Sequence, residues 1–284
     1  MSISNSASLK FFEKLGVKSV NLARECSLKQ IKEIKKKTKM KIETFVHGAM
    51  CVAESGRCFT SQFLYGKSAN RGDCIQPCRR QYQVKDIETG KELILENKFV
   101  MSPKDLCALP ILDRLVNAGI DCFKIEGRNR APEYVKTVTE AYREALDAIE
   151  KKKFNKKLAD ELMEKLETVY NRKFSTGFFL GTPTNDSWTD IYGSNAKKTK
   201  VFVGIVQNYY RKNSAAAILL QAGSIKKGDV LMIQGPTTGV FEQKIEKIMK
   251  NSEEINSAKK GDLVGIKTKK LVRKNDKVYV IRKS

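Results

Sequence analysis

Four of the seven cysteines in this 284-residue chain fall within one segment that has neither helical nor strand periodicity. Cys51, Cys58, Cys74 and Cys78 are separated by six, fifteen and three residues. Thiolates are soft ligands that select zinc or iron–sulfur clusters, and glycines in the same segment permit the tight turns that bring ligands together. An odd number of cysteines in a chain without a visible secretory signal argues against a disulfide framework. We therefore expect residues 47–80 to be an inserted loop that folds around a metal.

Zinc is the first alternative to a cluster. Zinc knuckles usually carry two pairs of cysteines with about two to four residues inside each pair, and only Cys74 and Cys78 match that spacing. The six-residue gap between Cys51 and Cys58 favours an iron–sulfur cluster. Buried structural cysteine is the second alternative, and it suits three residues at expected helices, strands or their boundaries: Cys26, Cys107 and Cys122.

Strand-like and helix-like segments alternate around this loop. Such alternation predicts a parallel sheet whose faces are covered by helices. About four β-α units fit into residues 1–154, whereas a closed (β/α)8 barrel needs about 250 residues. We therefore expect an α/β domain that is the C-terminal half of a (β/α)8-type barrel, with the cysteine-rich insertion. The expected strands are 18–23, 41–46, 98–102 and 120–126, the helices 8–15, 27–39, 104–117 and 132–150, and a hairpin covers 81–93.

The pattern changes in the last third of the chain. Residues 155–200 are expected to be a connector with one helix near 158–170, because clusters of Gly, Thr, Pro and Asn fill 177–197. From 201 to 284, short strand-like runs follow turn signals such as Gly228-Asp229 and Gly261-Asp262. This pattern predicts an all-β domain that closes into a small barrel.

The formal net charge of +22 raises the local concentration of polyanions, and RNA is the commonest polyanion in a cytoplasm. A solvated lysine-rich surface is the alternative, because charge alone does not define a site. No stretch approaches about eighteen consecutive apolar residues, so a membrane span is not expected. We expect a cytoplasmic protein that contacts RNA, with one candidate surface in the β domain: Lys267, Lys269, Lys270, Arg273 and Lys274.

The cysteine segment belongs to a longer series of motifs. Cys51 and Cys58 lie in ETFVHGAMC and GRCFTS, Cys74 and Cys78 in NRGDCIQPCRR, and MSPKDL and FKIEGRNRAPEYV follow. Together these motifs resemble the signature of peptidase family U32, the collagenase-like peptidases, with Thr60 where an aliphatic residue is usual. The tail motifs GDLVGIK and VRKNDKVYV resemble the small β-barrel that follows in this family, which is similar to domain 2 of elongation factor Tu. The resemblance covers essentially the whole chain.

The resemblance implies a function. Better understood relatives are hydroxylases that act without molecular oxygen on the wobble uridine of tRNA or on a base of ribosomal RNA. They carry an iron–sulfur cluster on the equivalent cysteines and are thought to use prephenate as the oxygen source, so we expect a cluster of the 4Fe–4S type here. We therefore expect an iron–sulfur-dependent RNA hydroxylase; a U32-type peptidase and a zinc-stabilised RNA-binding subunit are the alternatives. Because family members have a fuller barrel, a separate polypeptide that supplies its N-terminal half is a further expected partner.

The sequence offers few groups for peptidase chemistry. It has no HExxH and no G-x-S-x-G motif, and its only histidine is His47. His47 can pair with Cys51 as nucleophile and base, but Cys51 is then lost from the ligand set. His47 can instead donate a proton at the site, or simply hydrogen-bond the loop.

Charged residues at expected strand ends complete the candidate site, because barrel enzymes carry their chemistry there. Lys124, Glu126 and Arg128 alternate along one expected strand, so Glu126 is expected to pair with Lys124 or Arg128 and, second, to contact substrate. His47 and Glu126 are the candidate catalytic residues. Arginines beside the cysteines can bind phosphate or a carboxylated co-substrate, or offset the charge of a thiolate cluster. The candidate substrate-binding residues are Arg71, Arg79, Arg80, Lys124 and Arg128.

Overall fold

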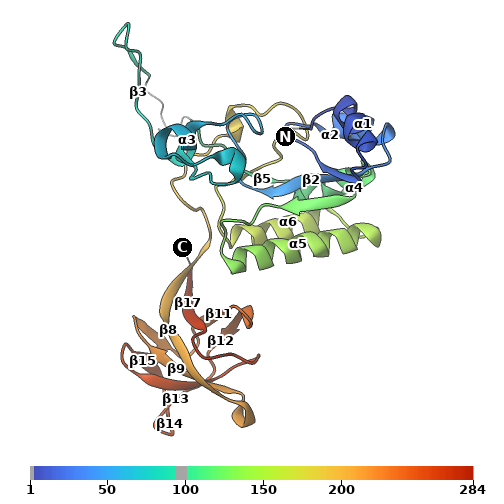
Figure 1. Cartoon of the computed structure of the whole chain (residues 1–284). Helices are drawn as coiled ribbons and strands as arrows, with labels where there is room; N and C mark the ends of the chain where they lie inside the picture. Colours follow the sequence, from blue (N-terminus) through green and yellow to red (C-terminus); the bar gives the residue numbers. More distant parts are fainter. Residues whose placement is uncertain (1–2, 94–100, 284) are drawn as a thin grey trace. The chain divides into compact units, whose positions relative to one another are not determined.

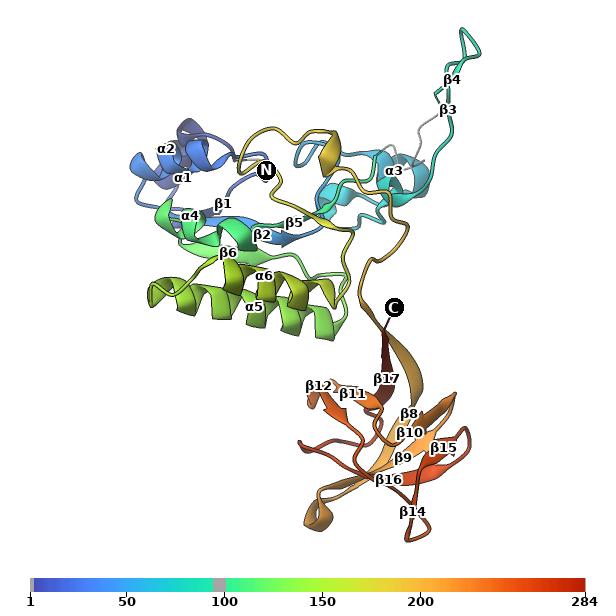
Figure 2. The ribbon, with the colours of Figure 1, turned by 180° about the vertical axis from the view of Figure 1, so that it is seen from behind.

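The structure is a computed structural model that describes residues 3–93 and 101–283. The chain divides into two compact units, drawn from blue to yellow and from orange to red in Figure 1 and from behind in Figure 2. The first unit comprises the residues up to Asn129 together with Thr137–Asn195. The second comprises Arg130–Lys136 and the residues from Ala196 onward. None of the described helices is long and apolar enough to cross a membrane.

The first unit begins with the expected helix and β-α-β motif. Helix α1 (Ser6–Lys14) precedes strand β1 (Ser19–Asn21), helix α2 (Leu28–Lys36) and strand β2 (Lys41–Gly48). The two strands are parallel. Ser27 starts α2 with a capping box, in which its hydroxyl accepts from the Gln30 amide while the Gln30 side chain accepts from the Ser27 amide. The helices and strands that local sequence signals predict in this region are therefore present in the structure.

Strand β2 organises the sheet. It pairs in parallel with β1 and with β6 (Cys122–Ile125), and antiparallel with β5 (Asp105–Cys107). Strand β7 (Phe174–Ser175) extends the sheet from β5. The sheet is therefore mixed, and the expected parallel order is correct for β1, β2 and β6 but wrong for β5. The half-barrel architecture stays a prediction.

Residues 104–117 were expected to form one helix, and this prediction is wrong in its first half. The segment contains strand β5, a 3-10 turn η3 (Leu109–Ile111) and a shorter helix α4 (Leu112–Asn117). Pro110 lies in η3, and inside a helix it would remove a hydrogen bond at a cost of about 3 kcal/mol. All three residues of β5 are buried, which suits a core strand. The expected strand at 98–102 lies mostly outside the described residues.

Two long helices cover one face of the sheet in both views. Helix α5 (Pro132–Glu150) has the predicted bounds, and α6 (Lys156–Glu167) is the helix expected near 158–170. Buried Leu162 and Leu166 form the inner side of α6. The Tyr142 hydroxyl donates to the carbonyl oxygen of Val46 at 2.7 Å and so ties α5 to β2.

The second unit is an antiparallel β domain, which confirms the expected change of class. Its main sheet follows the order β12-β11-β17-β8-β9-β16-β13-β14, and β10 pairs with β15. Ile218, Leu231 and Val280 belong to a hydrophobic core cluster of this domain. The strands are β8 (Lys198–Tyr210), β9 (Ala215–Leu220), β10 (Ser224–Lys226), β11 (Val230–Gly235), β12 (Gly239–Lys244), β13 (Ile248–Lys250), β14 (Glu253–Ile255), β15 (Ser257–Lys259), β16 (Leu263–Lys267) and β17 (Lys277–Lys283).

Gly48, the last residue of β2, packs closely against Glu126 at the point where the cysteine loop begins, and a substitution there tests this contact. Its φ is +122°, and an added Cβ would stand 2.6 Å from Cβ and 2.9 Å from the carbonyl oxygen of Glu126. We expect Gly48→Ala to lower the free energy of unfolding by about 2–4 kcal/mol, measured by urea denaturation. The control is Gly90→Ala, at φ +68° with nothing within 4 Å of the added Cβ, which should cost about 1–2 kcal/mol. Equal losses would contradict the contact with Glu126.

Candidate metal centre

The cysteine loop folds as short helical turns joined by left-handed residues. It contains α3 (Thr60–Tyr65), the 3-10 turns η1 (Ala69–Arg71) and η2 (Pro77–Arg79), and positive φ angles at Gly56, Gly72 and Gln76. A two-stranded hairpin, β3 (Val84–Lys85) and β4 (Glu92–Leu93), follows as predicted. The turns allow residues that are distant in the loop to face one cavity.

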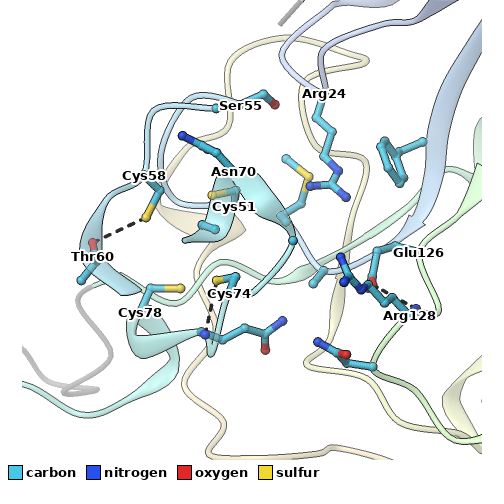
Figure 3. Close-up of a pocket in the computed structure, with 18 of the residues that line it drawn as sticks. Arg24, Cys51, Ser55, Cys58, Thr60, Asn70, Cys74, Cys78, Glu126 and Arg128 are labelled. Carbon is cyan, nitrogen blue, oxygen red and sulfur yellow. Dashed lines mark hydrogen bonds between the residues drawn. The ribbon is translucent and has the colours of Figure 1, made fainter. Parts of the chain in front are cut away.

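That cavity has a volume of about 450 Å³, and all four clustered cysteines line it. Figure 3 shows the four cysteine side chains on one side of the cavity and Arg24, Glu126 and Arg128 on the other. The second group comes from the ends of the strands of the sheet. The structure thus brings together the complete predicted thiol set.

Polar groups of the loop already hold two of the thiols. The backbone amide of Gln76 donates to Cys74 Sγ at 3.3 Å, and the hydroxyl of Ser61 donates to the same sulfur at 3.6 Å. Ser61 is fully buried on the inner side of α3. The Cys58 thiol donates to Thr60 Oγ1 at 3.5 Å. These hydrogen bonds fix the positions of the two sulfur atoms within the loop.

The four thiols are a soft donor set on one cavity. Zinc and iron–sulfur clusters are the metal sites that such a set selects. Within the described part of the chain, no group of three or more His, Cys, Asp or Glu side chains is already arranged to hold a metal ion.

Half-buried positive charge lies beside two of the thiols. Burial lowers the pKa of Arg24 and of Arg79, while Cys51 beside Arg24 and Cys78 beside Arg79 act in the opposite direction. Burial likewise raises the pKa of Cys51 and Cys78, and the neighbouring guanidinium groups oppose that rise. The guanidinium groups therefore offset part of the effect of burial on Cys51 and Cys78, and positive charge beside these sulfurs is compatible with thiolate ligands.

Arg79, expected as a substrate-binding residue, lines the cavity, and its guanidinium hydrogen-bonds to the protein. Its guanidinium donates to the carbonyl oxygens of Met50 and Pro103, both at 2.5 Å, and to Ser102 Oγ at 3.1 Å. These contacts join the start of the cysteine loop to the segment before β5. Arg79 therefore positions the loop.

Arg24 is a residue that the sequence reasoning missed. It follows β1, and its guanidinium carbon lies 4.0 Å above the centre of the Phe45 ring while the residue lines the cavity. Its place just after a strand is the signal that would have identified it.

Glu126 and Arg128 line the cavity as predicted candidates, but their pairing differs from the expectation. Lys124 forms its ion pair with Glu43 at 2.7 Å, not with Glu126. Strand β6 ends at Ile125, so the alternation stops before Glu126. The Glu126 carboxylate accepts from the backbone amide of Arg128 at 3.2 Å, and the Arg128 guanidinium packs against Gly72 where a side chain would stand.

The remaining candidates lie outside the cavity wall. His47 is 1% exposed, its Nδ1 lies 3.4 Å from the Tyr142 hydroxyl, and its ring contacts Phe174. Arg71 and Arg80 are exposed and, like Lys124, are not among the described residues that line the cavity.

The three other cysteines separate into two environments. Cys26 and Cys107 are buried, as expected, and burial raises the pKa of each thiol to about 11. Cys122 is exposed at the start of β6, which corrects the expectation that it is buried; its thiol lies 3.4 Å from a carboxylate oxygen of Glu43. None of the three lines the described cavity.

A buried ion pair between Arg172 and Asp105 connects the sheet to the cysteine loop. Arg172 and Asp105 lie 3.6 Å apart, with side chains 7% and 3% exposed, and the amide of Arg172 donates to Asp105 at 3.1 Å. The Arg172 guanidinium also donates to the Gln76 side chain at 3.3 Å, two residues from Cys74. The pair therefore couples β5 and the segment before β7 to the cysteine loop.

This ion pair predicts a large and specific loss of stability. Asp105→Asn leaves the buried guanidinium of Arg172 without its carboxylate, so the free energy of unfolding should fall by about 3–5 kcal/mol in urea denaturation. The control is Asp190→Asn, which breaks the exposed pair with Lys173 (2.8 Å, side chains 58% and 44% exposed) and should cost about 0–1 kcal/mol. If both variants lose the same amount, the buried pair does not support the loop.

Comparisons with known proteins give one family and two kinds of relative. A model of peptidase family U32 matches residues 1–189. A collagenase of Porphyromonas gingivalis is 39% identical over 290 residues, which cover 98% of this chain and 70% of that protein. A tRNA hydroxylation protein of Bacillus subtilis is 37% identical over 264 residues, covering 91% and 62%. A 23S rRNA 5-hydroxycytidine synthase of Escherichia coli is 46% identical over 140 residues, covering 49% and 21%.

Proposed function

The chain belongs to peptidase family U32, and from this membership and its thiol-lined cavity we propose that it is an iron–sulfur-dependent enzyme that hydroxylates a base of tRNA or ribosomal RNA without molecular oxygen. The observation that carries the proposal is the convergence of four thiols on one cavity whose opposite wall is made by strand-end residues. A cofactor and a substrate can then meet in the same cavity.

A 4Fe–4S cluster is the cofactor that best fits the donor set. The spacing between Cys51 and Cys58 is unlike a zinc knuckle, and all four thiols line one cavity. Half-buried Arg24 and Arg79 place positive charge beside Cys51 and Cys78, which suits the negative charge that a thiolate cluster carries. Cys51, Cys58, Cys74 and Cys78 would hold the cluster, which when bound supplies electron transfer or Lewis acidity.

The opposite wall supplies groups for binding and orientation. Of the described residues that line the cavity, Glu126 is the one with a carboxyl group, so its carboxylate oxygens are the candidates for holding or moving a proton. Arg24 and Arg128 are cations on the same wall, suited to a carboxylated co-substrate such as prephenate. His47 is buried against Tyr142, so we assign it a structural role.

RNA is the proposed macromolecular substrate. Two of the relatives are named for tRNA and rRNA hydroxylation, and the net charge of +22 favours a polyanion. The wobble uridine of tRNA and a base of ribosomal RNA are both consistent with these names.

Peptidase activity is the second candidate, because the P. gingivalis relative is named a collagenase. A cysteine peptidase needs a base within hydrogen-bond reach of its nucleophile. The only histidine of the chain, His47, packs against Tyr142 and Phe174 and is absent from the described wall of the thiol cavity. The geometry therefore supports hydroxylation better than proteolysis. A zinc-stabilised RNA-binding subunit is the third candidate, and metal analysis distinguishes it.

The metal content tests this proposal first. Protein purified without oxygen should contain about four iron and about four acid-labile sulfide per chain, and Cys74→Ala should lose most of both, because it removes one of the four ligands. Cys122→Ala is the matched control: this thiol is exposed and outside the cavity, so iron and sulfide should stay at the wild-type level. Stoichiometric zinc without sulfide would instead support the RNA-binding subunit.

The reaction itself is measured on RNA. Nucleoside mass spectrometry of tRNA and ribosomal RNA from a deletion strain should reveal the loss of a hydroxylated base, restored by the wild type and not by Cys74→Ala. Unchanged RNA together with cleavage of protein substrates that survives removal of iron would reverse the order of the first two candidates.

A further inference from the structure

Helix α3 carries its side chains in the reverse of the usual orientation. Ser61, a small polar residue, is fully buried and faces Cys74, whereas the large apolar residues of the same segment face outward. Phe63 is 86% exposed. We call this outer surface the α3 aromatic face; its members are Phe59, Phe63, Leu64 and Tyr65, with exposures of 50%, 86%, 53% and 41%. Large apolar side chains that are exposed close together in the sequence are a feature of binding surfaces.

The α3 aromatic face lies directly beside the thiol cavity. Cys58, which lines the cavity, immediately precedes Phe59, and Thr60 at the start of α3 also lines it. The inner side of the helix contacts Cys74 through Ser61, so one short helix presents its two sides to the cavity and to the surface. A macromolecule bound on the outer face is therefore within reach of the cavity.

Positive charge alternates with these rings along the sequence, and one cation contacts a ring in space. The guanidinium of Arg80 lies over the Tyr65 ring at 5.0 Å and hydrogen-bonds its hydroxyl. Arg57, Lys67 and Arg71 are exposed in the same segment. Residues 55–82 contain five basic residues and one acidic residue, and the acidic one, Asp73, already lies 3.7 Å from Lys67. Exposed aromatic rings among cations are the pattern of surfaces on which unpaired nucleotides stack.

We propose that the α3 aromatic face is a stacking platform for unpaired RNA bases next to the base that enters the thiol cavity. This inference rests on the proposed function, because it assumes an RNA substrate. It adds that the substrate is a single-stranded or loop segment, since bases inside a duplex cannot stack on Phe63. The cations beside the rings hold the backbone, and the rings hold neighbouring bases while one base turns into the cavity.

The test measures binding of a fluorescently labelled RNA stem-loop and of the fully paired duplex of the same length, to anaerobically purified protein. Phe63→Ala should weaken binding of the stem-loop by on the order of tenfold, from the loss of one stacked base, and leave the salt dependence unchanged. Arg71→Ala should also weaken binding, but it should lower the slope of log K against log salt by about 0.7. Phe11→Ala, an equally simple truncation of a 59% exposed ring on α1, is the matched control and should change neither.

The outcomes separate this inference from the proposed function. Wild-type protein that retains iron and sulfide but binds no RNA overturns both. Wild-type binding that Phe63→Ala leaves unchanged overturns the platform alone. A Phe63→Ala protein that binds RNA normally but no longer copurifies with a protein partner identifies the face as a protein interface, which also overturns it. A selective loss of stem-loop binding, with iron and sulfide retained, supports the platform.

Discussion

The rest of the site depends on holding a loop rich in thiols against a sheet that carries buried positive charge. Arg79 does this directly, because its guanidinium bonds the carbonyl oxygens at both sides of the junction, Met50 and Pro103. Arg172 also holds the loop, because its guanidinium donates to the Gln76 side chain and is paired with the Asp105 carboxylate. Buried guanidinium groups are unfavourable unless negative charge is close. Arg79, which fixes the loop, also opposes the rise that burial causes in the pKa of Cys78, so one guanidinium acts both on the position of the loop and on the charge of a thiol.

Much of the fold could be predicted because its signals are local. Ser27 and Gln30 define the start of α2 within four residues of sequence, and Pro132 stands at the first position of α5. The prediction of one helix for residues 104–117 was wrong in its first half because the apolar spacing there is compatible with either a helix or a buried strand followed by a turn. Contacts across the sheet, with His47 opposite Cys107, decide between these conformations, and no local window contains them. The antiparallel course of β5 has the same long-range origin.

The part of the candidate site that could be predicted is the part that depends on residue type alone. Four cysteines at unusual spacing indicate thiolate ligands without any knowledge of the fold. The partners of charged residues are different, because they depend on where a strand ends. Since β6 stops at Ile125, Lys124 faces Glu43 while Glu126 reaches the cavity. Arg24 went unnoticed because it is close to the cysteines in space and far from them in sequence.

Helix α3 connects these observations. A helix that bordered the thiols with a large apolar side chain would fill the space that a cofactor needs, and Ser61 leaves that space while donating to Cys74. With its inner side occupied by small polar residues, the helix has no core on which to bury Phe59 and Phe63. Exposing those rings is unfavourable by about 25 cal/mol for each Å² of apolar surface, so a chain that keeps them at the mouth of its cavity gains from them when a partner covers them. One short helix thus borders the thiols with a small polar side chain and presents its large apolar side chains to solvent.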